Sequence, residues 1–159
     1  MTWATERLDE IKQPGVTVPA VVETLGLGLI DDWGPGWVKK SWAPEARFAN
    51  VDGSLFGGYI AALADQVLTF AAMTVVPDEN WHRTTDLQVR FVKVGRGHPL
   101  LIEARVLAAT RRLITTEADF RRPDGELVAK ASAQQILLPK GDTISPRVIP
   151  VSRSEDRDP

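Results

Sequence analysis

The stretch NVDGSLFGGYIAALADQ, residues 50–66, predicts the central element of this protein. Gly57 and Gly58 open an apolar segment that continues to Val76, and Asp65 is the only acidic residue in it. Apolar side chains recur there at the three- and four-residue spacing of one helix face, which predicts a helix over about 57–75. The residues on that face are Ile60, Leu63, Ala64, Val67, Phe70, Ala71 and Thr74.

The opposite side of the predicted helix is almost uncharged as well. It consists of Ala61, Ala62, Leu68, Thr69, Ala72 and Met73. Asp65 lies on this side, at roughly 160° from the apolar face for a step of about 100° per residue. A helix that is apolar all round is buried on more than one side. Because one sheet can cover only one side, we expect a second subunit to cover the other.

Strands are predicted before and after this helix. One precedes it, in residues 34–44, and four follow it with alternating apolar and polar residues. The four cover residues 84–94, 100–109, 113–120 and 126–138, and the links between them are GRGHP, TRR and RPDG. Links of hairpin length require the joined strands to run antiparallel. We therefore expect an α+β fold in which an antiparallel sheet packs on one long helix.

The two ends of the chain differ from this central region. Short helices are predicted in residues 5–15 and 18–28, where Pro and Gly mark the helix boundaries. Residues 139–159 are rich in Pro, Ser and alternating charge, which predicts a loose tail. The expected organisation is an N-terminal extension (1–17), one domain (18–139) and a flexible C-terminal tail (140–159).

Composition and motifs exclude several classes of function. A net charge of −2 gives no electrostatic basis for nucleic-acid binding, and the absence of cysteine excludes disulfides and thiolate chemistry. His82 and His98 lack the spaced carboxylates of a metal site, and no serine-hydrolase elbow or phosphate-binding glycine motif is present. We therefore expect no metal and no cofactor. The N-terminus lacks an apolar signal core and no segment is long enough to span a bilayer, so we expect a cytoplasmic protein without membrane contact.

Asp65 and the glycine pair each have a structural and a functional interpretation. Asp65 is either a carboxylate bonded to backbone or to a partner hydroxyl, or a general base or nucleophile. Gly57 and Gly58 either allow a tight turn and close packing, or expose helix N-terminal amides to a carbonyl oxygen that gains charge.

Residues 50–72, NVDGSLFGGYIAALADQVLTFAA, resemble the signature segment of hotdog-fold acyl-CoA thioesterases of the PaaI-like type. The resemblance continues through the later strands and covers about residues 20–139. It implies a hotdog fold, in which an antiparallel sheet wraps around one long central helix and two subunits join their sheets. It also implies that the protein hydrolyses acyl-CoA thioesters.

The resemblance assigns four catalytic positions. The amide of Gly57 would polarise the thioester carbonyl, and Asp65 would act as base or nucleophile. Asn50 and Thr84 would position substrate or water. Eight residues of helix separate Gly57 from Asp65 by about 12 Å. We therefore expect Gly57 and Asn50 to come from one subunit of a homodimer, or of a dimer of dimers, and Asp65 and Thr84 from the other.

Further candidates for substrate contact adjoin these positions or lie in a strand turn. Phe56, Gly58 and Thr85 are neighbours of catalytic positions. Arg111 and Arg112 fall in a turn between strands, where basic groups would meet the phosphates of CoA. Ordinary solvated charges explain the two arginines equally well.

Phe56 departs from the family pattern, which has His-Gly-Gly where this chain has Phe-Gly-Gly. The phenyl ring either fills the place of an orienting imidazole or weakens catalysis. This departure keeps a second function open, that of a non-catalytic acyl-CoA-binding protein on the same fold. A hotdog hydratase is disfavoured, because that chemistry pairs the Asp with a His five residues later, where this chain has Phe70.

Overall fold

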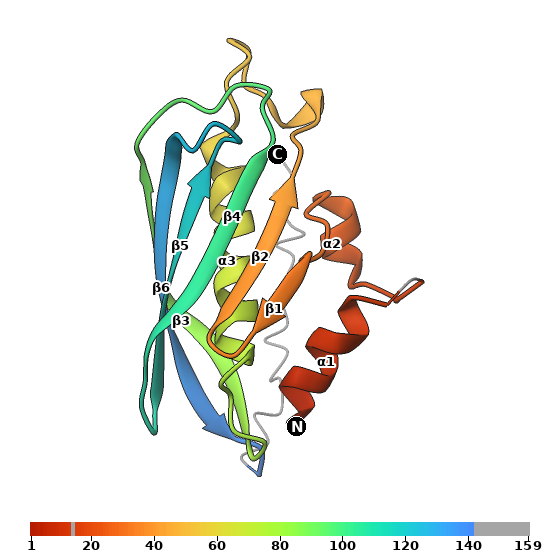
Figure 1. Ribbon diagram of the computed structural model, residues 1–159, viewed down its shortest axis with the longest axis vertical. Helices are drawn as coiled ribbons and strands as arrows, with labels where there is room; N and C mark the ends of the chain where they lie inside the picture. The colour runs from red at the N-terminus through yellow and green to blue at the C-terminus, as the bar shows by residue number, and fades with distance from the viewer. Residues whose placement is uncertain (14, 142–159) are drawn as a thin grey trace, which may run out of the picture.

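The long helix predicted from residue 57 is present as α3, Gly57–Met73, and runs through the centre of the molecule (Figure 1). The structure, a computed structural model, describes residues 1–13 and 15–141. A short 3-10 turn, η1 (Ala46–Phe48), precedes α3. The predicted C-terminal tail lies outside the described residues from residue 142 onward.

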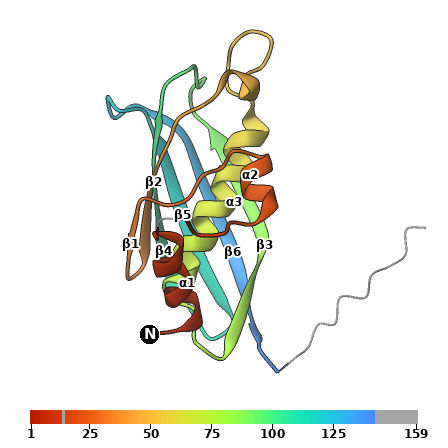
Figure 2. The same ribbon diagram turned by 90° about the vertical axis from the view of Figure 1, so that its right-hand side faces the viewer.

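A six-stranded antiparallel sheet wraps around α3 (Figures 1 and 2). Its strands are β1 (Asp32–Gly34), β2 (Trp37–Trp42), β3 (Asn80–Phe91), β4 (Leu100–Ala109), β5 (Leu113–Arg121) and β6 (Leu127–Pro139). Their order in space is β1-β2-β4-β5-β6-β3, so β3 forms one edge of the sheet. An antiparallel sheet around one long helix is the fold class that the sequence predicted.

The link between β3 and β4 does not form a hairpin, although its length predicted one. β4 pairs with β5 and β5 with β6, whereas β3 pairs with β6. The N–H groups of Val92 and Lys93 both donate to the carbonyl of Val128, and the carbonyl of Gly95 accepts from Leu55. These bonds lead the link across the end of the sheet beside the start of α3, so that β4 joins the sheet on the far side (Figure 1).

The buried band of α3 is wider than the sequence spacing predicted. It consists of Ile60, Leu63, Ala64, Val67, Leu68, Ala71, Ala72 and Met73. Leu68, Ala72 and Met73 were assigned to the opposite side, but all three are buried. Phe70 and Thr74 were assigned to the core face and are only half-buried. Asp65 is exposed, on the side where its spacing places it.

Two short helices lie on the side of α3 that the sheet leaves open (Figure 2). They are α1 (Trp3–Ile11) and α2 (Ala20–Thr24). Helix α1 buries Ala4, Leu8 and Ile11, and the indole N–H of Trp3 donates a 2.9 Å hydrogen bond to the carbonyl of Asn80. The chain itself therefore covers part of the side that the sequence assigned to a second subunit. Within residues 1–13 and 15–141, no helix is long and apolar enough to cross a membrane.

Candidate functional site

Asp65 and Thr84 are distant in sequence but meet in the structure. The hydroxyl of Thr84 donates a 3.0 Å hydrogen bond to Oδ1 of Asp65. Asp65 projects from the middle of α3 and is exposed in the single chain. Its other carboxylate oxygen has no hydrogen-bond partner among the described residues, so this oxygen can accept a proton or a hydrogen bond from water or substrate.

A β-bulge in β3 lies at this contact. The register between β3 and β6 shifts between Thr84 and Asp86, which leaves Thr85 as the extra residue. The hydroxyl of Thr85 donates to the carbonyl of Gln134 at 3.1 Å, so it is bonded within the sheet. Bulges bend a strand and re-aim its side chains. The bulge therefore bends β3 at this point, where Thr84 faces Asp65 and Thr85 bonds within the sheet.

Gly57 and Gly58 leave room for two aromatic rings at the start of α3. A Cβ atom at Gly57 would lie 3.0 Å from Cζ of Phe91, and one at Gly58 would lie 2.4 Å from Cε1 of Phe56. A side chain at Gly58 would therefore clash with the Phe56 ring, which is the close-packing role considered from the sequence. Phe56 and Phe91 are nevertheless 55% and 57% exposed, so both rings lie at the surface of the single chain.

The backbone N–H groups of the same glycines are unpaired. Neither Gly57 nor Gly58 donates to an acceptor among the described residues, as expected for the first turn of a helix. Such groups carry the positive end of the helix dipole, which suits a developing oxyanion. A cavity of about 340 Å³ lies beside Gly57 and is also lined by Ser54, Ile60 and Phe91. Both interpretations of the glycine pair therefore apply, because the rings pack closely against the glycines and the glycine amides are unpaired.

Asn50 lies in the tight turn that leads into α3. Its Nδ2 donates to Oγ of Ser54 at 2.9 Å, and that hydroxyl donates to Oδ1 of Asp52 at 2.6 Å. The turn is completed by Gly53 at a φ of +76°, a left-handed conformation that favours glycine. Among the hydrogen bonds of the described residues, none joins Asn50 to Asp65 within one chain.

Arg111 and Arg112 lie in the turn between β4 and β5, at the opposite end of the sheet from the start of α3 (Figure 1). Both residues are exposed. The carbonyl of Arg112 accepts from the N–H of Leu137 at 2.8 Å, which fixes the turn against β6. Within a single chain these arginines are therefore remote from the Gly57 amide.

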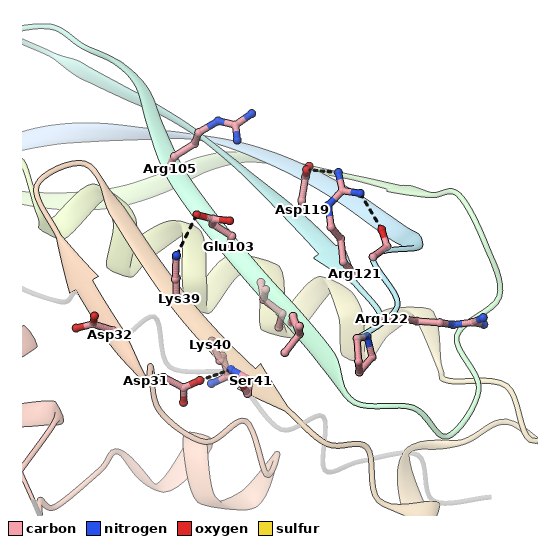
Figure 3. Close-up of a pocket in the computed structure, with 14 residues that line it drawn as sticks. Asp31, Asp32, Lys39, Lys40, Ser41, Glu103, Arg105, Asp119, Arg121 and Arg122 are labelled. Atoms are coloured by element: carbon pink, nitrogen blue, oxygen red, sulfur yellow. Dashed lines mark hydrogen bonds and ion pairs between the residues drawn. The ribbon is translucent and has the colours of Figure 1, made fainter.

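A cavity of about 460 Å³ lies on the outer face of the sheet, over β2, β4 and β5 (Figure 3). Two of its ion pairs join Lys39 to Glu103 at 3.7 Å and Arg121 to Asp119 at 2.8 Å. The residues that line this cavity include none of the predicted site residues. A second cavity, of about 440 Å³, lies between α3 and the segment that contains α1 and α2, and Asp65 lines it. We therefore place the candidate site at Asp65.

Lys40 is a buried ionisable residue that the sequence interpretation missed. It is 2% exposed, and its Nζ donates to the carbonyl of Leu29 at 3.0 Å and to Oε1 of Gln66 at 2.8 Å. Burial lowers the pKa of Lys40 to about 8. Gln66 follows Asp65 directly on α3, so this network adjoins the candidate site. The signal in the sequence was a lysine at an inward-facing position of the strand before the helix.

Known proteins are similar to this chain in sequence and in fold. The sequence pattern of the thioesterase superfamily matches residues 52–129. A protein from Saccharolobus solfataricus, provisionally named an esterase, is 33% identical over 94 residues, which are 59% of this chain and 66% of that protein. The matched region is thus slightly under two thirds of that relative's length.

Solved structures extend the match to the whole fold. A phenylacetic acid degradation-related protein from Ralstonia eutropha, provisionally named a thioesterase, has a TM-score of 0.72 at 25% identity. That alignment covers 85% of this chain and 99% of the other. The structure of smu.793 from Streptococcus mutans, bound to acetyl CoA, has a TM-score of 0.64 at 22% identity and covers 69% and 87% of the two chains.

Proposed function

Because this chain belongs to the thioesterase superfamily and has the hotdog fold, we propose that it hydrolyses acyl-CoA thioesters to a carboxylic acid and coenzyme A. The observation that carries the proposal is the hydrogen-bonded pair of Asp65 and Thr84 beside an open cavity. The acetyl CoA in the smu.793 structure supports CoA thioesters as the substrate class.

The proposed active site is shared between two subunits of a homodimer, which can itself assemble into a dimer of dimers. Gly57 and Asp65 of one helix are about 12 Å apart, too far to act on one carbonyl. A two-fold pair of antiparallel α3 helices would bring Gly57 of each subunit near Asp65 of the other. Strand β3 supports such a pair, because its 12 residues form an edge of the sheet that no other described strand covers. Exposed apolar side chains near the same edge are Phe56, Phe91, Val92 and Val94.

The proposed reaction consumes one water molecule. Thr84 holds the Asp65 carboxylate, which takes a proton from the water as the water oxygen bonds to the thioester carbonyl carbon. The amide of Gly57 from the other subunit donates to the carbonyl oxygen as it gains charge, and Asn50 positions the substrate. The C–S bond then breaks, and the CoA thiolate takes up the proton. Direct attack by Asp65, followed by hydrolysis of the anhydride, is the nucleophilic form of the same proposal.

Three of the remaining predicted residues would contact the substrate outside the reacting atoms, whereas Thr85 would act through its neighbour Thr84. Arg111 and Arg112 of the turn between β4 and β5 offer positive charge to the phosphates of CoA. Gly58 offers a second unpaired amide beside that of Gly57, and Thr85 holds the bulge that aims Thr84.

A non-catalytic acyl-CoA-binding protein is the second candidate function. The observation that favours it is the Phe56 ring, which packs against Gly58 at the start of α3 where the family has an orienting histidine. A phenyl ring offers no hydrogen bond to hold the substrate or the Asn50 turn.

One experiment separates the two functions. The wild-type protein and the Asp65→Asn variant are incubated with acetyl-, butyryl-, octanoyl- and phenylacetyl-CoA, and release of the free thiol is followed. We expect thiol release from the wild-type protein and its loss in the variant. Calorimetric binding of the same compounds without thiol release by the wild-type protein would establish the binder instead.

A further inference from the structure

The cavity beside Asp65 has walls from two parts of the chain. Its volume is about 440 Å³, within the range of small-molecule pockets. Most of its lining is apolar, including Val22, Leu25 and Leu29 from the N-terminal segment and Ala62, Phe70 and Met73 from α3.

Resting on the function proposed above, we infer that this cavity holds the acyl group, so that the N-terminal segment with α1 and α2 sets acyl specificity. The thioester carbonyl must lie beside Asp65 to react, and Asp65 itself lines the cavity. The carbons that follow the carbonyl can therefore enter the cavity directly, while the CoA portion leaves on the opposite side of the carbonyl. The N-terminal wall thereby becomes part of the substrate site.

Hydrogen bonds fix the N-terminal wall to α3 next to Asp65. Nζ of Lys40 donates to the carbonyl of Leu29 and to Oε1 of Gln66, and Nε2 of Gln66 donates to the carbonyl of Gly28 at 2.9 Å. These bonds use both ends of the Gln66 amide and tie the chain at residues 28–29 to the helix one position after Asp65. The depth of the cavity is therefore fixed relative to the reacting carbonyl.

The charges around the cavity favour an uncharged acyl group. Arg7 is the one cation among its lining residues, and its guanidinium already donates to Oε2 of Glu10 at 2.9 Å. A second carboxylate on the acyl group would meet an apolar wall and the negative charge of Asp65. The substrate class is therefore linear or aryl acyl groups that are larger than acetyl and carry no charge. Each methylene that enters the cavity should raise kcat/KM by about fourfold until the cavity is full.

Two neighbouring residues of α2 provide a matched test. Val22 is half-buried and lines the cavity, whereas Glu23 is exposed and does not. Val22→Phe and Glu23→Phe add the same ring to the same short helix. We expect the wild-type octanoyl-to-acetyl ratio of kcat/KM to exceed ten, to fall at least tenfold in Val22→Phe and to stay unchanged in Glu23→Phe. Thr69→Phe fills the cavity from α3 and should act like Val22→Phe if that variant does not fold.

Binding measurements keep this inference separate from the proposed hydrolysis. Dissociation constants of octanoyl- and acetyl-CoA are measured by calorimetry in the Asp65→Asn background with and without Val22→Phe. Preference for octanoyl-CoA that Val22→Phe removes supports the acyl cavity, even if the wild-type protein hydrolyses nothing. A wild-type octanoyl-to-acetyl ratio of kcat/KM near one overturns the inference. So does an equal loss of kcat/KM for both chain lengths in the folded Val22→Phe and Thr69→Phe variants.

Discussion

The middle and the start of α3 offer the two halves of the proposed chemistry in different ways. In the middle, Asp65 is aimed by one hydrogen bond from Thr84 and stays open to solvent. At the start, Gly57 and Gly58 present unpaired amides beneath the rings of Phe91 and Phe56. The Asp65 half therefore depends on a polar contact between α3 and β3. The glycine half depends on the absence of side chains at Gly57 and Gly58.

This difference determines how each half can be damaged. The Asp65 half carries a charge that no neighbouring residue replaces, so its loss removes the chemistry and leaves the packing. The glycine half uses backbone N–H groups that every substitution except proline keeps, so it is altered mainly through the rings and the turn that surround it. Substitutions in the two halves should therefore have effects of different kind and size.

The largest effect is expected for Asp65→Asn. The amide keeps the shape and can still accept the hydrogen bond from Thr84, but it cannot take up a proton or attack the carbonyl. We expect kcat to fall by about two to four orders of magnitude, the usual range for a lost acid–base group. Thiol release gives the rate, and circular dichroism with a melting curve serves as the folding control. Equal rates for the two proteins, with a change in melting temperature alone, would assign Asp65 a structural role.

Mixed dimers test whether the two halves come from different subunits. Asp65→Asn and Asn50→Ala homodimers should each be nearly inactive. In a mixed dimer, one of the two sites keeps both Asn50 and Asp65, and the other keeps neither. Random reassortment makes about half of the dimers mixed, so about a quarter of all sites should regain activity.

The subunits are exchanged by mild denaturation and refolding, and native mass spectrometry confirms the mixed dimers. Each variant refolded alone is the control. Confirmed mixed dimers that are no more active than the separate variants would show that the site lies within one chain or excludes Asn50.

The sequence predicted the Asp65 half, which depends on residue spacing, better than the glycine half, which depends on packing. Spacing placed the helix at 57–75, close to the observed Gly57–Met73, and it put Asp65 on the side away from the core. Alternation predicted a strand over residues 84–94. It could not show that the Phe91 ring reaches Gly57, because that contact depends on where the end of β3 meets another element.

The pairing of β3 with β6 was invisible for a similar reason. Link length alone predicted a hairpin between β3 and β4, and the crossing of the link depends on its bonds to Val128 and Leu55, which are distant in sequence. The bulge that separates Thr84 from Thr85 follows from that pairing, so the sequence offered both threonines without distinguishing their directions. The assignment of roles came from the family resemblance and not from spacing.

A smaller effect should separate the two threonines. Thr84→Val removes the donor to Asp65, whereas Thr85→Val removes a donor to the backbone of β6. We expect kcat to fall about tenfold in the first variant and to change little in the second, since one hydrogen bond to a charged group is lost only at Thr84. Steady-state thiol release with a common substrate gives both values. Equal losses in the two variants would mean that the bulge matters as packing and that Thr84 does not orient the carboxylate.

The smallest effect is expected at the start of α3, for Phe56→His. An imidazole can lie over Gly58 as the phenyl ring does, and it adds a donor at the place where the family has an orienting histidine. We expect kcat/KM to rise about two- to tenfold, as for one additional hydrogen bond. Phe56→Leu is the matched control, because it removes the ring without adding a donor and should not raise activity. A folded Phe56→His variant with lower turnover on every acyl-CoA would show that the surroundings have adapted to the phenyl ring. The glycine half would then be set by packing alone, and the contrast with the polar Asp65 half would be sharper still.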